Sequence, residues 1–141
     1  MEAQDTDLTL YYSLVSQPSR AVKTLIDIGK VKHKEVHVDI MKGEHKKEEF
    51  VAINPRSLVP FIVEGDFKLG ESNAVLKYLC ETNESIPEHY WPKDPKKRAL
   101  TDQFLEWYQY HFRPTVLPPL RAKLNQLFTG EAPAADFIAY Y

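Results

Sequence analysis

A short segment near the N-terminus, from Tyr12 to Arg20, joins an apolar β-type run to a helical pattern. Pro18 has its φ preset for a first helical turn and gives up only an N–H that the turn does not use, so Ser16 or Gln17 falls at or next to the N-cap. A hydroxyl held among the free N–H groups of a helix N-terminus can stabilise an anion. This junction is our first candidate for chemistry, with simple helix capping by Ser16 as the alternative.

The elements around this junction follow from the spacing of apolar residues. Residues 8–12 predict a short central strand, and the helix after it carries Val22, Leu25 and Ile26 on one stripe and stops at Gly29. The segment 34–40 alternates and predicts a half-buried edge strand. Its inward face would hold Val36, Val38 and Ile40. Together these elements predict a right-handed β-α-β crossover.

The next stretch predicts a second structural pattern. Residues 43–52 are charged and weakly amphipathic, which predicts a marginal surface helix or an irregular loop that Asn54-Pro55 ends. Two apolar runs within residues 58–69 flank a tight turn at Gly65 and predict an antiparallel hairpin. A helix over residues 72–82 follows, so the second pattern is β-β-α.

The last third of the chain predicts helices. Asp94-Pro95 supplies a cap and a first-turn proline for a helix with a long aromatic stripe, which three prolines should break or kink (Pro114, Pro118 and Pro119). A segment of this size rarely buries a core of its own. We therefore predict a first domain over residues 1–83, a linker over residues 84–95 and an incomplete helical domain over residues 96–141.

Composition and charge narrow the possible function classes. The 141 residues are 43% apolar and 27% charged, which is ordinary for a soluble globular protein. The net charge of −2 gives no electrostatic grip on nucleic acid or on an anionic membrane. The polar N-terminus lacks the pattern of a signal peptide, and no apolar run approaches membrane length. These features predict a cytoplasmic protein.

Cysteine and histidine offer little for redox or metal chemistry. The single cysteine, Cys80, shares helical spacing with Val75 and Leu79, which favours a buried thiol over a reactive one. Ser16 and Ser19 stand where a redox pair of the Cys-x-x-Cys type would be expected, so redox chemistry of that kind is disfavoured. The five histidines show no metal-ligand spacing, and we predict no metal site.

Five motifs occur in a fixed order along residues 8–113, with Tyr90-Trp91-Pro92 in the linker. They are Ser16 to Val22, Asp39-Ile40 with Lys42 to His45, Asn54-Pro55 with Val59-Pro60, Gly65 to Phe67, and Glu71-Ser72 with Ala74-Val75. In this order they resemble the theta class of glutathione S-transferases. The resemblance implies an α/β thioredoxin-like domain (β-α-β then β-β-α) that binds glutathione, followed by an all-α domain of which this chain holds only the beginning.

The resemblance also implies roles for individual residues. Ser16 matches the serine that hydrogen-bonds the glutathione sulfur, and Gln17 matches its neighbour. Val59 precedes a cis proline, Pro60, and matches the residue whose backbone pairs with the cysteinyl part of glutathione. The remaining matches are Glu71 and Ser72 at the γ-glutamyl end, His45 and Lys46 near the glycyl carboxylate, and Arg113 at the pocket for the electrophile.

Elementary chemistry agrees with the role implied for Ser16. A serine hydroxyl is too weak a base to remove a thiol proton at neutral pH, so it would donate a hydrogen bond that favours the thiolate. Lowering a thiol pKa from about 8.5 by two units needs roughly 2.7 kcal/mol, within reach of one charge-assisted bond at a helix N-terminus. Tyr12 shares its strand parity with Leu8 and Leu10, so its ring should point into packing instead.

Two functions remain open at this point. The first is a glutathione transferase that conjugates or reduces small electrophiles, acts in detoxification and forms a homodimer, as the resemblance implies. The second is a non-catalytic transferase-like module for protein association, as in translation elongation factor gamma subunits. Leu58 stands where the family often has lysine and favours the module, whereas Ser16, Gln17, Glu71 and Ser72 favour the enzyme.

Overall fold

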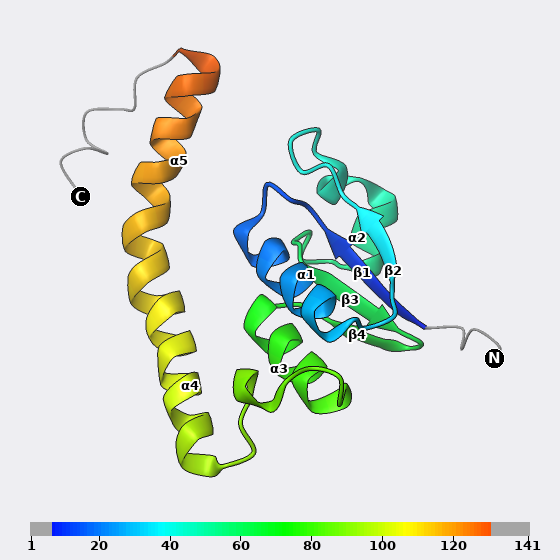
Figure 1. Cartoon of the computed structure of the whole chain (residues 1–141). Helices are drawn as coiled ribbons and strands as arrows, with labels where there is room; N and C mark the ends of the chain where they lie inside the picture. The colour runs from blue at the N-terminus through cyan, green and yellow to red at the C-terminus, as the bar shows by residue number, and fades with distance from the viewer. Residues whose placement is uncertain (1–6, 131–141) are drawn as a thin grey trace. The chain divides into compact units, whose positions relative to one another are not determined.

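In the computed structural model of the chain, which describes residues 7–130, four short strands form one mixed sheet (Figure 1). The strands lie in the order β2-β1-β3-β4, with β1 parallel to β2 and the other pairs antiparallel. Their bounds are Leu8–Tyr12 (β1), Lys34–His37 (β2), Phe61–Glu64 (β3) and Phe67–Leu69 (β4). The predicted thioredoxin-like order, β-α-β and then β-β-α, is confirmed.

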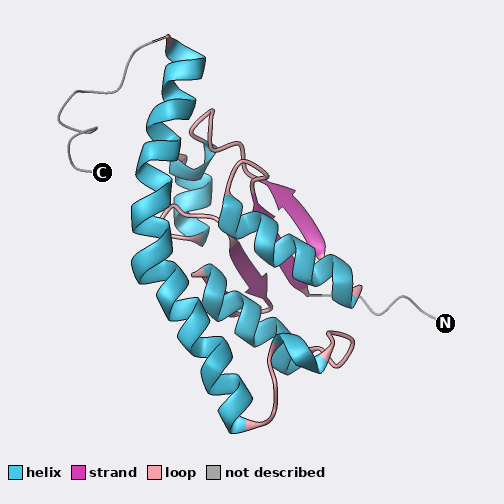
Figure 2. Cartoon of the chain, turned by 60° about the vertical axis from the view of Figure 1, so that its left-hand side comes forward, coloured by secondary structure: helices cyan, strands magenta, loops and turns pink. Residues whose placement is uncertain are grey.

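The helices of this part of the chain lie on both faces of the sheet (helices cyan and strands magenta in Figure 2). The two longer ones, α1 (Gln17–Gly29) and α3 (Ser72–Thr82), share one apolar core with the sheet. The short α2 (Glu48–Ile53) packs Phe50 against Tyr11 with ring centroids 5.9 Å apart. Because Tyr11 has the opposite strand parity to Leu10, α2 covers the other face. Two 3₁₀ turns, Glu44–Lys46 and Glu88–Tyr90, complete this unit.

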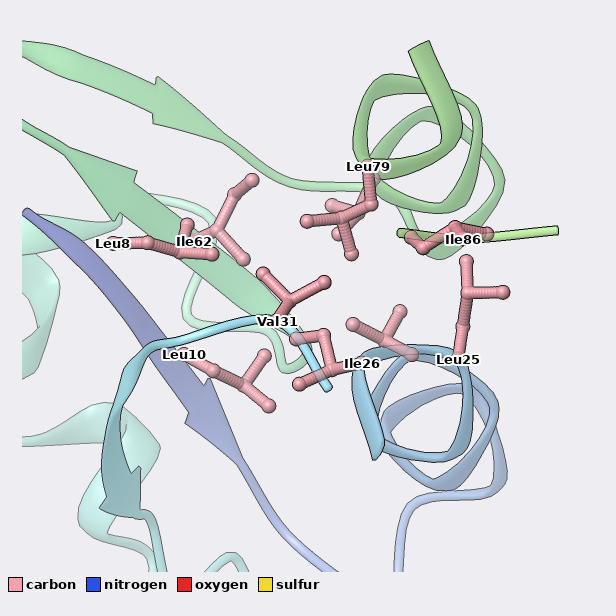
Figure 3. Packing of buried hydrophobic residues seen from close by; sticks show 10 residues of the cluster. Leu8, Leu10, Leu25, Ile26, Val31, Ile62, Leu79 and Ile86 are labelled. Atoms are coloured by element: carbon pink, nitrogen blue, oxygen red, sulfur yellow. The ribbon is translucent and has the colours of Figure 1, made fainter. Parts of the chain in front are cut away.

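The core between α1, α3 and the sheet is continuous (Figure 3). Leu10 and Ile62 are aligned neighbours on β1 and β3, and both are fully buried. Ile26 of α1 and Leu79 of α3 close over them without solvent exposure. The other members of this cluster are Leu8, Val22, Leu25, Val31, Val75 and Ile86. This packing fixes the two helices whose N-termini carry predicted site residues.

The edge strand differs from its prediction. The strand β2 ends at His37, and Val36, which we expected to face inward, is 39% exposed. Val36 is aligned with Tyr11 on the face that α2 covers, but β2 is the edge strand and all four of its residues are exposed. Val38 is buried as predicted, but it follows the strand.

The chain divides into two compact units, Met1–Pro92 and Lys93–Tyr141, and the second is helical from Pro95 to Thr129. The helix α4 (Pro95–Trp107) begins at Asp94, whose side chain accepts a hydrogen bond from the Lys97 N–H at 2.9 Å. A five-residue π-helix, Tyr108–Phe112, leads directly into α5 (Arg113–Thr129). The division falls inside the predicted linker, and the predicted domain bounds stay a prediction.

The later prolines do not break the helix, so of the predicted break or kink, the break is wrong. Pro118 and Pro119 lie inside α5, and Pro114 stands in its first turn, where the missing N–H costs little. The wider π turn directly before Pro114 gives the backbone room there. Leu120, Ala122 and Lys123 then favour helix and carry it past the prolines. None of the helices in residues 7–130 has the length and apolar character to cross a membrane.

Tyr78 links α3 to β3, because its hydroxyl donates a hydrogen bond to the Glu64 carboxylate. This bond, together with burial, raises the pKa of Tyr78 to about 12. A tyrosine whose pKa is raised on folding keeps its proton in the folded state while the unfolded chain loses it, so its stabilisation is complete below about pH 10 and falls as the pH rises toward 12.

We therefore predict that the unfolding free energy of the wild type falls between pH 10 and 12. In Tyr78→Phe it should fall less over the same range. Urea titrations of the wild type and the variant at several pH values measure it. The matched control is Tyr110→Phe, since Tyr110 is 73% exposed. Difference curves that are equal for the two variants would contradict the prediction.

Candidate functional site

The topology brings most of the predicted site residues to one end of the sheet. Tyr12 at the end of β1 is aligned with His37 at the end of β2, because these strands are parallel. Tyr11 is also aligned with Phe61, the first residue of β3. Leu69, the last residue of β4, is aligned with Ile62. The segments that follow β1, β2 and β4 and the one that precedes β3 therefore leave the sheet at the same end.

Ser16 joins two of these segments. It is the N-cap of α1, and its Oγ accepts a hydrogen bond from the Ser19 N–H at 3.4 Å. The same hydroxyl donates to the carbonyl oxygen of Val59 at 3.4 Å, across 43 residues of sequence. The Val59-Pro60 peptide bond is cis, as the resemblance implied. The group proposed for the sulfur thus lies beside the backbone proposed for the cysteinyl part.

Several buried polar atoms near the predicted residues have no hydrogen-bond partner. Among the residues that the structure describes, these atoms are Gln17 Oε1, Ser19 Oγ and His45 Nδ1. Buried polar groups in folded proteins are nearly always paired, so an unpaired one calls for a ligand or water. Gln17 begins α1, and His45 lies in the 3₁₀ turn with the exposed Lys46. Ser19 is the member of this set that the sequence reading missed.

The turn that holds His45 is fixed by its own carboxylates. The Asp39 carboxylate accepts from the N–H groups of Met41 and Lys42 at 3.1 and 3.2 Å, and the Glu44 carboxylate accepts from the Asp39 N–H at 2.7 Å. The Lys42 backbone N–H holds the pKa of Asp39 below its usual value. The segment between β2 and α2 is thus an ordered turn and a 3₁₀ helix. The sequence had allowed either a marginal helix or an irregular loop over residues 43–52.

Glu71 and Ser72 stand at the N-terminus of α3. Glu71 is the N-cap with a φ of 63°, a left-handed value that is uncommon for a residue other than glycine. Its side chain makes no cap bond and pairs instead with Arg56, with Nη1 3.0 Å from Oε1. Ser72 is the first helical residue and is 8% exposed. A strained residue at a helix N-terminus is common at ligand sites.

The loop before Val59 is organised by Asn54, which is 4% exposed. Its amide donates to the Leu58 carbonyl at 2.8 Å, and its side-chain oxygen accepts from the Arg56 N–H at 3.1 Å. The sequence pattern predicted only a helix end at Asn54. An Asn-Pro pair with polar residues after it is the signal for such a side-chain turn.

Tyr12 has a partner of its own at the end of β1. It packs against the core, as predicted, and its hydroxyl donates to Glu35 Oε2 at 3.0 Å. This bond raises the pKa of Tyr12 above its usual value. Glu35 is also held by Lys23 at 2.8 Å and by His33 at 3.0 Å. The tyrosine hydroxyl is thus engaged in a charged network on β2.

The remaining predicted groups lie elsewhere. Arg113 belongs to the second unit, where its Nη1 donates to Gln109 Oε1 at 2.9 Å, and its role at an electrophile pocket stays a prediction. Cys80 is half-buried against the core, and burial raises the pKa of its thiol. Within residues 7–130, no cluster of three or more His, Cys, Asp or Glu side chains could hold a metal ion.

Comparison with known proteins matches this geometry to one family. Residues 7–81 match the model of the glutathione S-transferase N-terminal domain. The chain is 35% identical over 133 residues to human glutathione S-transferase theta-1, a match that covers 94% of this chain and 55% of the relative.

Solved structures give the same result. Human glutathione-S-transferase T1-1 in its apo form superposes with a TM-score of 0.86 at 34% identity, over 94% of this chain and 56% of that one. Human glutathione transferase theta-2, solved in complex with glutathione, superposes with a TM-score of 0.69 at 40% identity, over 72% of this chain and 42% of that one. The chain thus spans about half the length of these proteins.

Proposed function

The chain belongs to the glutathione S-transferase family, theta class, and from this we propose that it forms the glutathione-binding part of a transferase. The reaction is the conjugation or reduction of a small electrophile by the glutathione thiolate. The observation that carries the proposal is the 3.4 Å contact between Ser16 Oγ and the carbonyl oxygen of Val59. It joins the residue proposed for the sulfur to the residue proposed for the cysteinyl backbone.

Ser16 would act as a hydrogen-bond donor to the sulfur. Its Oγ already accepts from the Ser19 N–H, which leaves the hydroxyl proton to donate. In the ligand-free chain that proton goes to the Val59 carbonyl over a long bond, and glutathione would offer a charged sulfur as a stronger acceptor. The N-terminus of α1 adds to the stabilisation of the thiolate.

The rest of the tripeptide would lie along the same end of the sheet. The released Val59 backbone would pair with the cysteinyl part, and Pro60 in cis shapes this edge. The unpaired Gln17 Oε1 and His45 Nδ1 are two polar groups that a ligand could satisfy. At the γ-glutamyl end, Glu71 suits an ammonium and Ser72 with its helix N–H groups suits a carboxylate. Lys46 beside His45 offers a cation for the glycyl carboxylate.

The chemical step needs little from the protein beyond a positioned thiolate. The sulfur lone pair forms a bond to the electrophilic carbon, and the leaving group departs with its bonding electrons. With a hydroperoxide the thiolate attacks the terminal oxygen instead, the O–O bond breaks, and the alkoxide leaves and is protonated to an alcohol. The sulfur is oxidised to a sulfenic acid, which a second glutathione converts to the disulfide with release of water. Arg113 in the second unit is our candidate residue beside the electrophile.

The alternative is a non-catalytic module that uses the same fold for protein association. Leu58, which is 58% exposed, is uncharged where the family often has lysine, and this favours the module. Passing the whole protein over immobilised glutathione and then assaying turnover of a small alkyl halide separates the two. Retention with turnover supports the enzyme, whereas neither retention nor turnover supports the module.

We further propose a homodimer that acts in the cytoplasm in detoxification, without nucleic-acid or membrane partners. The second unit supports association, because its helices carry large exposed apolar side chains, more than a monomer usually leaves uncovered. These include Leu100, Phe104, Trp107, Tyr110 and Leu127, from 47% to 73% exposed.

We predict that the 141-residue chain self-associates at micromolar concentration, measured by sedimentation velocity. Phe104→Ser should shift the distribution toward smaller species, because it removes a ring from this apolar surface. Lys68→Ser is the control, since Lys68 is an exposed residue of β4. A wild type that sediments as a monomer would contradict the prediction.

A further inference from the structure

The ion pair between Arg56 and Glu71 gives the proposed site a cation to which no role has been assigned so far. We propose that Arg56 is a further ligand-binding residue, which together with Glu71 receives the α-amino-acid head group of the γ-glutamyl residue. Glu71 would hold the ammonium, and Arg56 would join Ser72 in holding the carboxylate on the same carbon. This inference rests on the proposed function, because it takes glutathione as the ligand.

The position of Arg56 is fixed by its backbone. Its N–H is held by the buried Asn54 at 3.1 Å, and the next residue, Ser57, has a φ of 55° and donates its N–H to the Asn54 carbonyl at 2.9 Å. On the other side, Glu71 also has a left-handed φ, of 63°. The pair therefore contains one strained residue, Glu71, and adjoins a second, Ser57, and strain of this kind is often found at functional sites.

The fold does not need this ion pair. The side chains of Arg56 and Glu71 are 74% and 60% exposed, and exposed pairs contribute little to stability. The pair is nevertheless located between the Val59 loop and the N-terminus of α3, the two segments proposed to hold the tripeptide. A binding role explains this position, whereas a stabilising role does not.

The charges of the pair are complementary to an α-amino-acid head group. With Nη1 3.0 Å from Oε1, the pair presents a positive and a negative group side by side. An ammonium and a carboxylate on one carbon can lie alongside this pair, with the ammonium against Glu71 and the carboxylate against Arg56. A guanidinium has five N–H donors, so Arg56 can keep one bond to Glu71 and still offer a fork to a carboxylate. The glycyl end of glutathione has no ammonium and does not match the pair.

The test is calorimetric titration of the whole protein with two ligands. One is glutathione, and the other is its analogue without the γ-glutamyl α-carboxylate, γ-aminobutyryl-cysteinyl-glycine. We expect the wild type to bind the analogue about 10- to 100-fold more weakly, the usual loss for one charged hydrogen-bonded contact. Arg56→Gln should weaken glutathione binding and should distinguish the two ligands less than the wild type does, because only Ser72 and the helix N–H groups then hold the carboxylate.

Two controls make the result specific to this contact. Lys68→Gln removes an exposed charge on β4 and should bind both ligands as the wild type does. Arg56→Lys keeps the charge without the fork and should recover part of the preference for glutathione. The thermal unfolding midpoint of Arg56→Gln should be unchanged, because the pair is exposed.

Other outcomes overturn the inference. If Arg56→Gln binds glutathione equally well or more tightly, Arg56 only masks Glu71, and the inference fails while the proposed function stands. If the losses from the variant and from the analogue simply add, Arg56 acts on the whole ligand and not on this carboxylate. A wild type that binds no glutathione overturns the proposed function itself.

Discussion

Replacing Ser16 by alanine is expected to lower the turnover of the whole protein about 10²-fold or more, the usual scale for losing one positioned donor to a developing or resident anion. Ground-state binding of glutathione should change little, because the contacts to the backbone of Val59 and to Glu71 remain. The pKa of the bound thiol should rise toward its free value of about 8.5, since the thiolate loses its hydrogen bond.

An absorbance titration of the thiolate in the complex measures this pKa, and initial rates with an alkyl halide measure turnover. Ser16→Thr is the matched variant, because it keeps both the hydroxyl and the capping oxygen that the Ser19 N–H uses. Ser16→Gly separates loss of the donor from loss of the helix cap, because glycine lacks the hydroxyl but costs only about a few tenths of a kcal/mol as an N-cap, against about 1 kcal/mol for alanine.

Tyr12→Phe tests the competing assignment, in which the Tyr12 hydroxyl holds the sulfur. The Tyr12 hydroxyl donates to Glu35 in the ligand-free chain, so its removal should leave most of the activity in place. A thiol pKa that rises in Tyr12→Phe and is unchanged in Ser16→Ala would show that the serine is only a helix cap.

The local elements were predictable because each has its own signal in the sequence. The helix α3 runs from Ser72 to Thr82 as its apolar stripe predicts, and the hairpin turns at Gly65, whose φ is 56°. Pro18 in the first turn of α1 predicted an N-cap at or next to Ser16 or Gln17, and the N-cap is Ser16. In each case short-range backbone chemistry and tertiary packing favour the same structure, so local sequence patterns predict it correctly.

The details of the site were not predictable from local patterns. The bond from Ser16 to Val59 and the pair of Arg56 with Glu71 join residues that are far apart in sequence. Each depends on the register of a strand pair, which apolar alternation does not determine for a chain read alone. The roles proposed for Ser16, Val59 and Glu71 came from the resemblance. Arg56 gained a candidate role only from the structure.

The misjudged elements have a different cause. Local rules predicted a break or kink at Pro118 and Pro119 and an inward face for Val36. The helix α5 continues because its neighbouring residues favour helix, and Val36 is exposed because β2 is an edge strand whose four residues are all exposed. In both cases the surroundings outweigh the preference of a single residue.

The second large effect is expected in the core that positions the site. Leu79 of α3 is fully buried in the cluster that includes Ile26 of α1 and Ile62 of β3. Leu79→Ala removes buried methyl groups and leaves a cavity between both helices and the sheet, and such changes cost about 2–5 kcal/mol. A loss of about 3 kcal/mol lowers the folding equilibrium constant by roughly 10²-fold.

Urea unfolding followed by circular dichroism measures this loss, with Leu58→Ala as the control of identical chemistry. Leu58 is 58% exposed, so its truncation should cost less than about 0.5 kcal/mol. Equal losses in the two variants would mean that α3 is not held by this core. The comparison bears on function, because α1 presents Ser16 and α3 presents Glu71 and Ser72. If packing at Leu79 sets their spacing, folded Leu79→Ala should also bind glutathione more weakly than the wild type.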